Sequence, residues 1–435
     1  MYCAIDFGTS NSAIAVPDGD TAMRLVELEP GQLTMPTAVF YFVEGPERGG
    51  PPRAFGRAAV AAYVDGIDGR LMRSMKSILG SSLIDQTTDV GGGRGARYID
   101  IVAGFLKQLK NRAEAQLNTP VEQVVLGRPV YFVDDDRARD AKAQAALESA
   151  ARQVGFRDIL FQYEPIAAAF DYERSVDREQ CVLVADIGGG TSDFSIVRVG
   201  PRPATRIERK GDILANHGVH IAGTDFDRRV ELAMILPELG YGAYGPSIGG
   251  AAPREVPSGV YFDLATWHLI NTVYSPQRVA ELRGMRGFYA NPLHHERLMT
   301  VLDHHLGHEL AARAEAAKID VAEGGDCRID LGAVERSLAT TLSERQAIEA
   351  IEHDIEHIVE AARLTARQAS LGPDQVDALY FTGGSTGLRL LAERIAAAFP
   401  AARPVRGDRF ASVATGLGLH ACKCFGGRFD ACGDD

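Results

Sequence analysis

The sequence predicts an α/β protein with a duplicated fold, in which each half begins with a strand hairpin. The prediction rests on two glycine-rich runs, Ile5–Ser12 and Val184–Asp193, each containing an aspartate at the end of an apolar run. A second apolar run follows each of them, Ala13–Val16 and Phe194–Val199, and strand, tight turn and strand is the pattern of a hairpin. Strand and helix patterns alternate between and after the two hairpins, which is typical of α/β proteins.

The two turns consist of small residues, and this composition favours the binding of a phosphate group. A turn without bulky side chains lets backbone N–H groups converge on an anion. The aspartate before each turn, Asp6 or Asp186, cannot contact a phosphate directly because like charges repel, but it can hold Mg²⁺ or its water molecules. Two such hairpins predict that one nucleotide phosphate chain is held between two lobes.

The first half of the chain alternates between strand and helix patterns. Short apolar runs predict strands at residues 2–6, 12–16, 23–28, 37–42, 121–126 and 159–162. Apolar residues at helical spacing predict helices over residues 54–79, 98–117, 137–154 and 165–172. The last of these helices has a proline in its first turn, where the missing N–H costs nothing.

The second half restarts the same order of elements. A strand over 181–185 leads into the second hairpin, and a third strand is expected around Ile207–Arg209. Further helices are predicted over 343–369, 388–398 and 413–422, with a strand at 378–381. The stretch from Pro237 to Pro257 is rich in glycine, proline and tyrosine and predicts a loop.

These motifs resemble the actin-like ATPase superfamily, and within it the ATPase domain of DnaK-type heat-shock chaperones, over most of residues 1–422. Short YegD-like relatives without a peptide-binding domain are the most similar group. The resemblance implies a two-lobed actin-like ATPase fold of duplicated ribonuclease-H-like domains, with a nucleotide cleft between the lobes. It implies a lobe I of residues 1–173 with a return segment 406–425 and a tail of residues 426–435. It also implies a lobe II of residues 174–405, which includes an outer subdomain at about residues 225–320 that is atypical of the family.

The resemblance implies ATP or ADP with Mg²⁺ as the cofactors. In the family the two hairpin turns hold the phosphates, and the matching residues here are Gly8, Thr9, Ser10, Asn11, Gly188, Gly189, Gly190 and Thr191. The aspartates that match the metal shell, through water molecules, are Asp6, Asp186 and Asp193.

The resemblance also implies the catalytic residues, Lys76, Glu164, Asp186 and Thr191. Lys76 stands in Lys76–Gly80, which fits the K-x-L-[IL]-G setting of the family's catalytic lysine. A lysine near the γ-phosphate would offset the charge that develops on the leaving oxygen. Glu164 stands in Tyr163–Ala169, which matches N-E-P-T-A-A-A, where the glutamate organises the attacking water and the metal shell.

The adenosine side matches the family less completely. The matching residues are Gly223 in the G-G-x-D-F-D turn, Gly383, Gly384 and Ser385 in the G-G-S-T turn, and Glu315 and Lys318 in the ribose-binding E-x-x-K pair. The two arginines that stack on adenine in the family are replaced by Ile319 and Gly387, and the adenine-binding serine is replaced by Ala322. The resemblance therefore implies retained phosphate and ribose binding and an altered base site.

Composition excludes some other classes of function. A net charge of −12 disfavours nucleic acid and anionic membranes as the main partners. The chain shows neither a targeting segment nor an apolar stretch long enough to span a membrane, so the cytoplasm is the expected compartment. Six cysteines are too few for a disulfide scaffold, and the group of Cys422, Cys424 and Cys432 with His420 matches no common zinc module.

The leading hypothesis is a slow, chaperone-like ATPase of the DnaK/YegD type, in which nucleotide-dependent lobe closure is read by an unknown protein partner or co-chaperone. The chain stops about fifteen residues after its last predicted helix, so no direct peptide clamp is expected. Two alternatives remain open: an MreB-type filament-forming ATPase, which shares E-P-x-A-A-A and G-G-G-T-x-D, and a small-molecule kinase of the same fold.

Overall fold

The computed structural model describes residues 1–19, 22–45, 52–133, 136–201, 206–247, 252–322, 324–407 and 412–426. The chain divides into two compact units. The first unit comprises residues 1–219, 361–386 and 396–435, and the second comprises residues 220–360 and 387–395. The predicted lobe boundaries stay a prediction; of the tail, residues 427–435 lie outside the described residues, as do residues 408–411 of the return segment.

Two mixed sheets of the first unit have the same topology. The strands of the first sheet are β1 (Tyr2–Phe7), β2 (Asn11–Asp18), β3 (Ala22–Leu25), β4 (Thr34–Pro36), β10 (Gln123–Arg128) and β11 (Asp158–Tyr163). The strands of the second sheet are β12 (Gln180–Ile187), β13 (Ser192–Val199), β14 (Ile213–Val219), β17 (Ala378–Thr382) and β18 (Arg403–Arg406). The order β11-β10-β1-β2-β3, with β4 also paired to β2, corresponds to β18-β17-β12-β13-β14.

The strand directions agree as well as the order. In each sheet an antiparallel hairpin, β1–β2 or β12–β13, continues antiparallel into a third strand, β3 or β14. The first strand of each hairpin pairs in parallel with β10 or β17, and these pair in parallel with β11 or β18. The predicted α/β class, both hairpins and the duplication are therefore confirmed.

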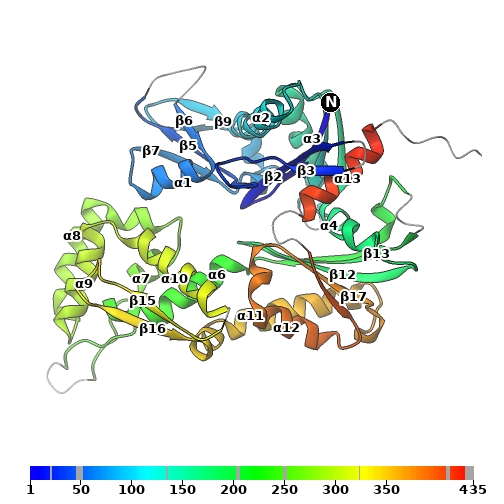
Figure 1. Ribbon diagram of the computed structural model, residues 1–435. Helices are drawn as coiled ribbons and strands as arrows, with labels where there is room; N and C mark the ends of the chain where they lie inside the picture. The colour runs from blue at the N-terminus through cyan, green and yellow to red at the C-terminus, as the bar shows by residue number, and fades with distance from the viewer. Residues whose placement is uncertain are drawn as a thin grey trace, which may run out of the picture. The chain divides into compact units, whose positions relative to one another are not determined.

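Helices and smaller sheets complete the first unit (Figure 1). Among the described residues, the α-helices of this unit include α1 (Gly56–Val64), α2 (Tyr98–Leu117), α3 (Arg137–Gln153), α4 (Glu164–Glu173) and α13 (Ser412–Phe425). The smaller sheets consist of β5 (Ala38–Phe42), β6 (Arg53–Phe55) and β7 (Gly69–Arg73), and of β8 (Thr87–Asp89) and β9 (Gly95–Arg97).

Two predictions of local structure are wrong. The expected helix over 54–79 ends at Val64, after which Gly66 adopts a φ of +68° and β7 pairs with β5. A Cβ at Gly69 would lie 2.3 Å from the carbonyl oxygen of Tyr41, so this strand contact admits no side chain there. The third strand expected around Ile207–Arg209 lies six residues later, in β14, because Arg209 belongs to a buried ion-pair network instead.

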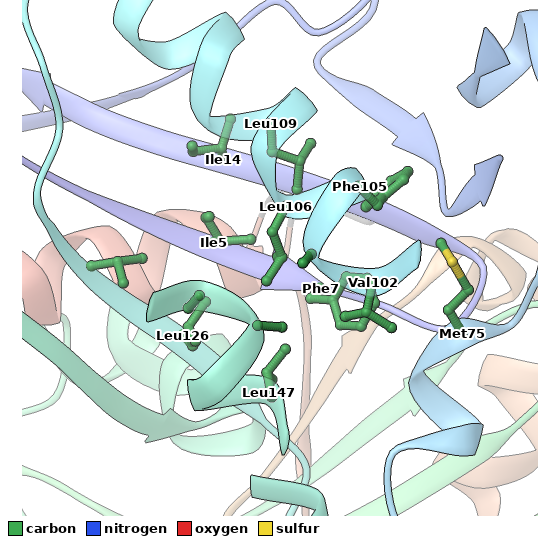
Figure 2. Packing of buried hydrophobic residues seen from close by; sticks show 14 of the residues in the cluster. Ile5, Phe7, Ile14, Met75, Val102, Phe105, Leu106, Leu109, Leu126 and Leu147 are labelled. Atoms are coloured by element: carbon green, nitrogen blue, oxygen red, sulfur yellow. The ribbon is translucent and has the colours of Figure 1, made fainter. Parts of the chain in front are cut away.

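The first sheet is covered on one face by α2 and α3. Figure 2 shows Leu106 and Leu109 of α2 pointing toward Ile5 of β1 and Ile14 of β2. All four side chains are fully buried, and each such burial contributes about 1.5–3 kcal/mol. This packing holds β1 and β2 in place and so fixes the turn between them.

The helices α4 and α13 join the two sheets. One apolar cluster contains side chains of β1 and β10, of α4 and α13, and of β12 and β17. The contact between the two helices is close: a Cβ at Gly416 of α13 would lie 1.9 Å from the carbonyl oxygen of Ala167 in α4. Only glycine fits this crossing without moving one helix away from the other.

The second unit contains mainly helices. Its elements include α6 (Gly223–Val230), a π-helical turn (Glu231–Ile235), α7 (Gly259–Leu264), α8 (Pro276–Arg283), α9 (Pro292–Asp303), α10 (Gly307–Ala322), β15 (Asp326–Asp330) and β16 (Ala339–Ser343). The unit has its own apolar core, in which the buried Tyr261 donates a hydrogen bond to the carbonyl of Leu239 at 2.8 Å. Two helices, α11 (Glu344–Gln368) and α12 (Arg389–Ala398), have residues in both units.

Within the ranges that the structure describes, none of the helices combines the length and the apolarity that crossing a membrane requires.

The helix crossing at Gly416 yields a stability prediction. Gly416→Ala is expected to lower the free energy of unfolding by about 1–3 kcal/mol, because the new methyl group collides with a backbone carbonyl. The matched control is Gly104→Ala in α2, where the nearest atom is the flexible tip of Arg53 at 3.6 Å. That variant is expected to gain about 0.5–1 kcal/mol from helix propensity. Urea denaturation measures both; equal effects of the two substitutions would contradict the close crossing.

Candidate functional site

Four carboxylates and one lysine gather where the two hairpins turn. Asp6 and Asp186 occupy the second-to-last positions of β1 and β12, and Asp193 of β13 pairs with Asp186. Glu164 is the first residue of α4, and Lys76 lies in a 3₁₀ turn, η1 (Met75–Ile78). All five residues belong to the first unit.

Lys76 and Glu164 form the central ion pair of this group. The Nζ atom of Lys76 lies 2.6 Å from Oε1 of Glu164, and the two side chains are only 10% and 14% exposed. Burial acts to lower the pKa of Lys76, but the charges of Glu164, Asp6 and Asp186 outweigh it and raise the pKa above its usual value. The lysine is therefore a charged hydrogen-bond donor across the physiological pH range.

The two strand-end aspartates hold their protons unusually tightly. Burial, together with the charge of Glu164, raises the pKa of Asp6 to about 7, although Lys76 opposes the shift. Burial and the charges of Asp193, Glu164 and Asp6 raise the pKa of Asp186 to about 8. One lysine does not compensate the negative charge of this site.

This excess of negative charge fits a divalent cation. A bound Mg²⁺ would relieve the repulsion among the carboxylates and lower their pKa values. Among the described residues, no three His, Cys, Asp or Glu side chains are arranged to bind a metal ion directly. Magnesium usually keeps several of its water molecules, so Asp6, Asp186 and Asp193 fit an ion that is held through water.

The first turn is held in place by Thr37, which lies between β4 and β5. The backbone N–H of Thr37 donates to the carbonyl of Ser10 at 2.9 Å, and the hydroxyls of Thr37 and Ser12 lie 2.8 Å apart in a buried position. A Cβ at Gly8 would lie 2.1 Å from the carbonyl oxygen of Asn11, so only glycine fits at the start of this turn. These contacts fix the backbone of the predicted phosphate-binding residues, Gly8, Thr9, Ser10 and Asn11.

The second turn is stabilised by hydrogen bonds within its own hairpin. The N–H of Gly188 donates to the carbonyl of Thr191 at 2.9 Å, and the Thr191 hydroxyl donates to Oδ2 of Asp193 at 2.9 Å. Gly189 and Gly190 lie between these two residues, so the predicted phosphate-binding residues of this hairpin share one short loop.

The turn after β17 packs directly on the second hairpin. Ser385 donates its hydroxyl hydrogen to the carbonyl of Gly188 at 2.7 Å. Gly383 has a φ of +85°, and a Cβ there would lie 2.6 Å from Oδ1 of Asp186. The structure thus brings Gly383, Gly384 and Ser385 together with Gly188 and Asp186, which are far away in the sequence.

The remaining predicted residues lie in the second unit. Lys318 of α10 forms an ion pair with Asp227 of α6 at 2.6 Å, and its Nζ lies 3.4 Å from the carbonyl of Gly223. Burial raises the pKa of Asp227 to about 6 against the influence of Lys318. Glu315 is exposed on α10, and the nearby Ile319 is 53% exposed.

The C-terminal cysteine group is not arranged as a metal site among the described residues. His420 is buried and its pKa is lowered to about 4, chiefly by burial. Its Nδ1 lies 3.1 Å from Nε2 of Gln162, and its Nε2 lies 3.5 Å from Sγ of Cys424. Cys432 lies outside the described residues.

Sequence reasoning missed two sets of residues near this site. Thr37 fastens the first turn, and a buried network of Glu173, Arg209 and Asp212 lies at the far end of α4. None of these residues belongs to a short motif, because their partners come from separate segments of the chain. The only local signal in the sequence is Glu173, which ends the alanine-rich helix that begins with Glu164.

A sequence model of a family described as Hsp70 protein matches residues 2–235, which is more than half of the 435-residue chain. The matched range contains Lys76, Glu164 and both hairpin turns. The turn at Gly383–Ser385 and the pair Glu315 and Lys318 follow it in the sequence.

The crowded carboxylates predict a pH-dependent effect of Asp186→Asn. Because the pKa of Asp186 is about 8 in the folded protein and 3.8 in a model peptide, the folded state binds more protons between these values. Stability is therefore lost as the pH rises through this window. The variant lacks this titration, so its stability relative to the wild type is expected to grow by about 1–3 kcal/mol between pH 5 and pH 8.

Urea denaturation at both pH values measures this difference, with Asp158→Asn, an exposed aspartate of the same unit, as the control. Addition of Mg²⁺ at pH 8 should stabilise the wild type more than Asp186→Asn. An advantage of the variant that does not change with pH would contradict the raised pKa of Asp186.

Proposed function

The chain belongs to the Hsp70 family of chaperone-type ATP-binding proteins, and from this premise we propose that it binds Mg²⁺–ATP and hydrolyses it slowly at the carboxylate cluster of the first unit. The observation that carries the proposal is the ion pair of Lys76 and Glu164 beside Asp6 and Asp186, at the turns of two duplicated hairpins. Duplicated small-residue turns supply N–H groups for the phosphates, and the cluster supplies charges for the reaction.

In this proposal each residue has a defined task. The turns at Gly8–Asn11 and Gly188–Thr191 bind the phosphates through backbone N–H groups. Lys76 donates to the oxygen on which charge develops during γ-phosphoryl transfer. Glu164 accepts a hydrogen bond from the attacking water and orients it, and Thr191 holds the γ-phosphate in place. Asp186 would act on the phosphates indirectly, through the water shell of Mg²⁺. Mg²⁺, held through water by the aspartates, would neutralise phosphate charge.

The proposal extends to the coupling of nucleotide to a partner. We propose a protein of the DnaK/YegD type, in which nucleotide-dependent closure of the lobes is read by a protein partner or co-chaperone in the cytoplasm. Glu315 and Lys318 bind the ribose in this scheme, and Gly223, Gly383, Gly384 and Ser385 contact the nucleotide through their turns. The exposed surface of Glu315 and the helical spacing of the pair support this role.

The first functional prediction concerns Lys76→Ala. The variant is expected to hydrolyse ATP about 10²- to 10³-fold more slowly, because a donor aimed at developing charge is lost. ATP binding should be largely retained, since several backbone N–H groups contribute to it. Single-turnover hydrolysis and calorimetry with ATP, with and without EDTA, measure the two quantities.

Lys142→Ala serves as the control, because Lys142 forms only an exposed ion pair with Asp85. Unchanged turnover in Lys76→Ala would remove this lysine from the mechanism. Failure of the wild type to bind millimolar ATP would refute the proposed function altogether.

The second functional prediction concerns the nucleotide base. Ile319 and Gly387 stand where the resemblance implies arginines stacked on adenine, and Ala322 stands where it implies a serine. We expect ATP to bind in the micromolar range or more weakly, with little preference over GTP. Ile319→Arg is expected to strengthen ATP binding by about 0.5–2 kcal/mol through stacking on the base.

The matched control is Ile207→Arg, the same substitution at an exposed isoleucine of the first unit. Titration of ATP and GTP against all three proteins decides the matter. Nanomolar ATP binding by the wild type, with strong rejection of GTP, would show that other residues hold the base.

A further inference from the structure

The helix α4 carries a glutamate at each end, and each glutamate is held by a cation from another part of the first unit. Glu164, the first residue, pairs with Lys76, while Glu173, the last residue, pairs with Arg209. The rise of 1.5 Å per residue separates the two ends by about 14 Å. Only the first glutamate lies in the candidate site.

Arg209 forms a bidentate ion pair with Glu173. Its Nη2 donates to Oε1 of Glu173 at 2.9 Å, and its Nη1 donates to Oε2 at 3.0 Å. Its Nε donates to Asp212 at 2.5 Å, and Nη2 also reaches the carbonyl of Arg198 at 3.3 Å. The planar guanidinium therefore fixes both the distance and the orientation of the helix end.

The network is deeply buried. The side chains of Arg209, Glu173 and Asp212 are 1%, 2% and 0% exposed, and only Arg206, which pairs with Asp212 at 3.0 Å, reaches solvent. Buried ion pairs of this kind add little net stability, since apolar side chains of similar volume often serve equally well. Their specific contribution is to restrict the positions of the elements that carry them, because charges in a buried network tolerate little displacement.

The ion pair of Arg209 and Glu173 connects α4 to β13, the strand that begins after the second turn. Gly200, directly after β13, donates its N–H to Oε1 of Glu173 at 3.0 Å, and the carbonyl of Arg198 in β13 accepts from Arg209. The same strand starts at Ser192, immediately after the Gly188–Thr191 turn. Arg209 thus sets the register of α4 along β13. This register in turn determines where Glu164 lies relative to the Gly188–Thr191 turn.

We propose that Arg209 is a positioning residue for Glu164, which sets the register of α4 against β13 through the buried contact with Glu173. The inference rests on the proposed ATPase function. A shift of the helix by about 1 Å would move the Glu164 carboxylate away from its working geometry, and such displacements cost up to about 10²-fold in rate.

The test compares steady-state ATP hydrolysis, ATP affinity and unfolding for three variants. Arg209→Lys keeps the positive charge but loses the bidentate contact with Glu173. The double variant Arg209→Met with Glu173→Leu removes both charges, so neither is left buried without a partner, and Asp212 keeps Arg206. Lys110→Met is the control, because Lys110 forms a partly buried ion pair with Glu114 on α2, away from α4.

We expect kcat to fall about 10-fold or more in Arg209→Lys and in the double variant, while KM for ATP and the calorimetric affinity change less than about threefold. The double variant should regain the unfolding stability that Arg209→Lys loses, yet remain slow. The control should keep its kcat.

A double variant that regains both stability and kcat would overturn the inference, because Arg209 would then serve stability alone. Wild-type kcat in a folded Arg209→Lys would overturn it as well. A wild type that neither binds nor hydrolyses ATP refutes the proposed function instead, and calorimetry on the wild type separates that failure from a failure of this inference.

Discussion

The contact between α4 and α13 is the constraint on which the first unit depends. Each of the two duplicated sheets has an apolar face that must be covered, and these two helices cover both from between them. Their close approach at Gly416 lets the apolar cluster run without interruption from β1 to β12. Because α4 begins with Glu164, the same contact that builds the core also delivers a carboxylate to the ends of both hairpins.

The candidate site is an electrostatic consequence of this arrangement. Asp6 and Asp186 occupy equivalent positions in the two hairpins, so joining the sheets brings their charges within range of Glu164 and Lys76. Burial, together with the repulsion between these charges, raises the pKa values of the two aspartates, and perturbed groups of this kind gather at functional sites. A divalent cation, as in the proposed function, would relieve this unfavourable charge density.

Much of the fold follows from local patterns. For the hairpins and for the long amphipathic helices α2, α3 and α11, the predicted ends lie within two residues of the observed ends. Their apolar residues are spaced so that they fall on the face that the fold buries. The segment from Ala54 to Leu79 was mispredicted because the pairing of β7 with β5, a long-range contact, overrides a helical pattern. The displaced third strand has a similar cause, since the partners of Arg209 come from α4 and from the turn that opens β14.

By itself, the sequence determined the duplicated hairpins, their small-residue turns and the resemblance that singled out Lys76 and Glu164, because these signals lie in short contiguous motifs. The family match confirms the resemblance to DnaK-type heat-shock chaperones, while the YegD-like form and the roles of the individual residues stay proposals. Only the tertiary structure decided that Lys76 meets Glu164, that Gly383 packs on Asp186, and that Arg209 clamps the far end of α4. The physical reason is that burial and pairing of charges depend on segments up to about 200 residues apart, which no local pattern records.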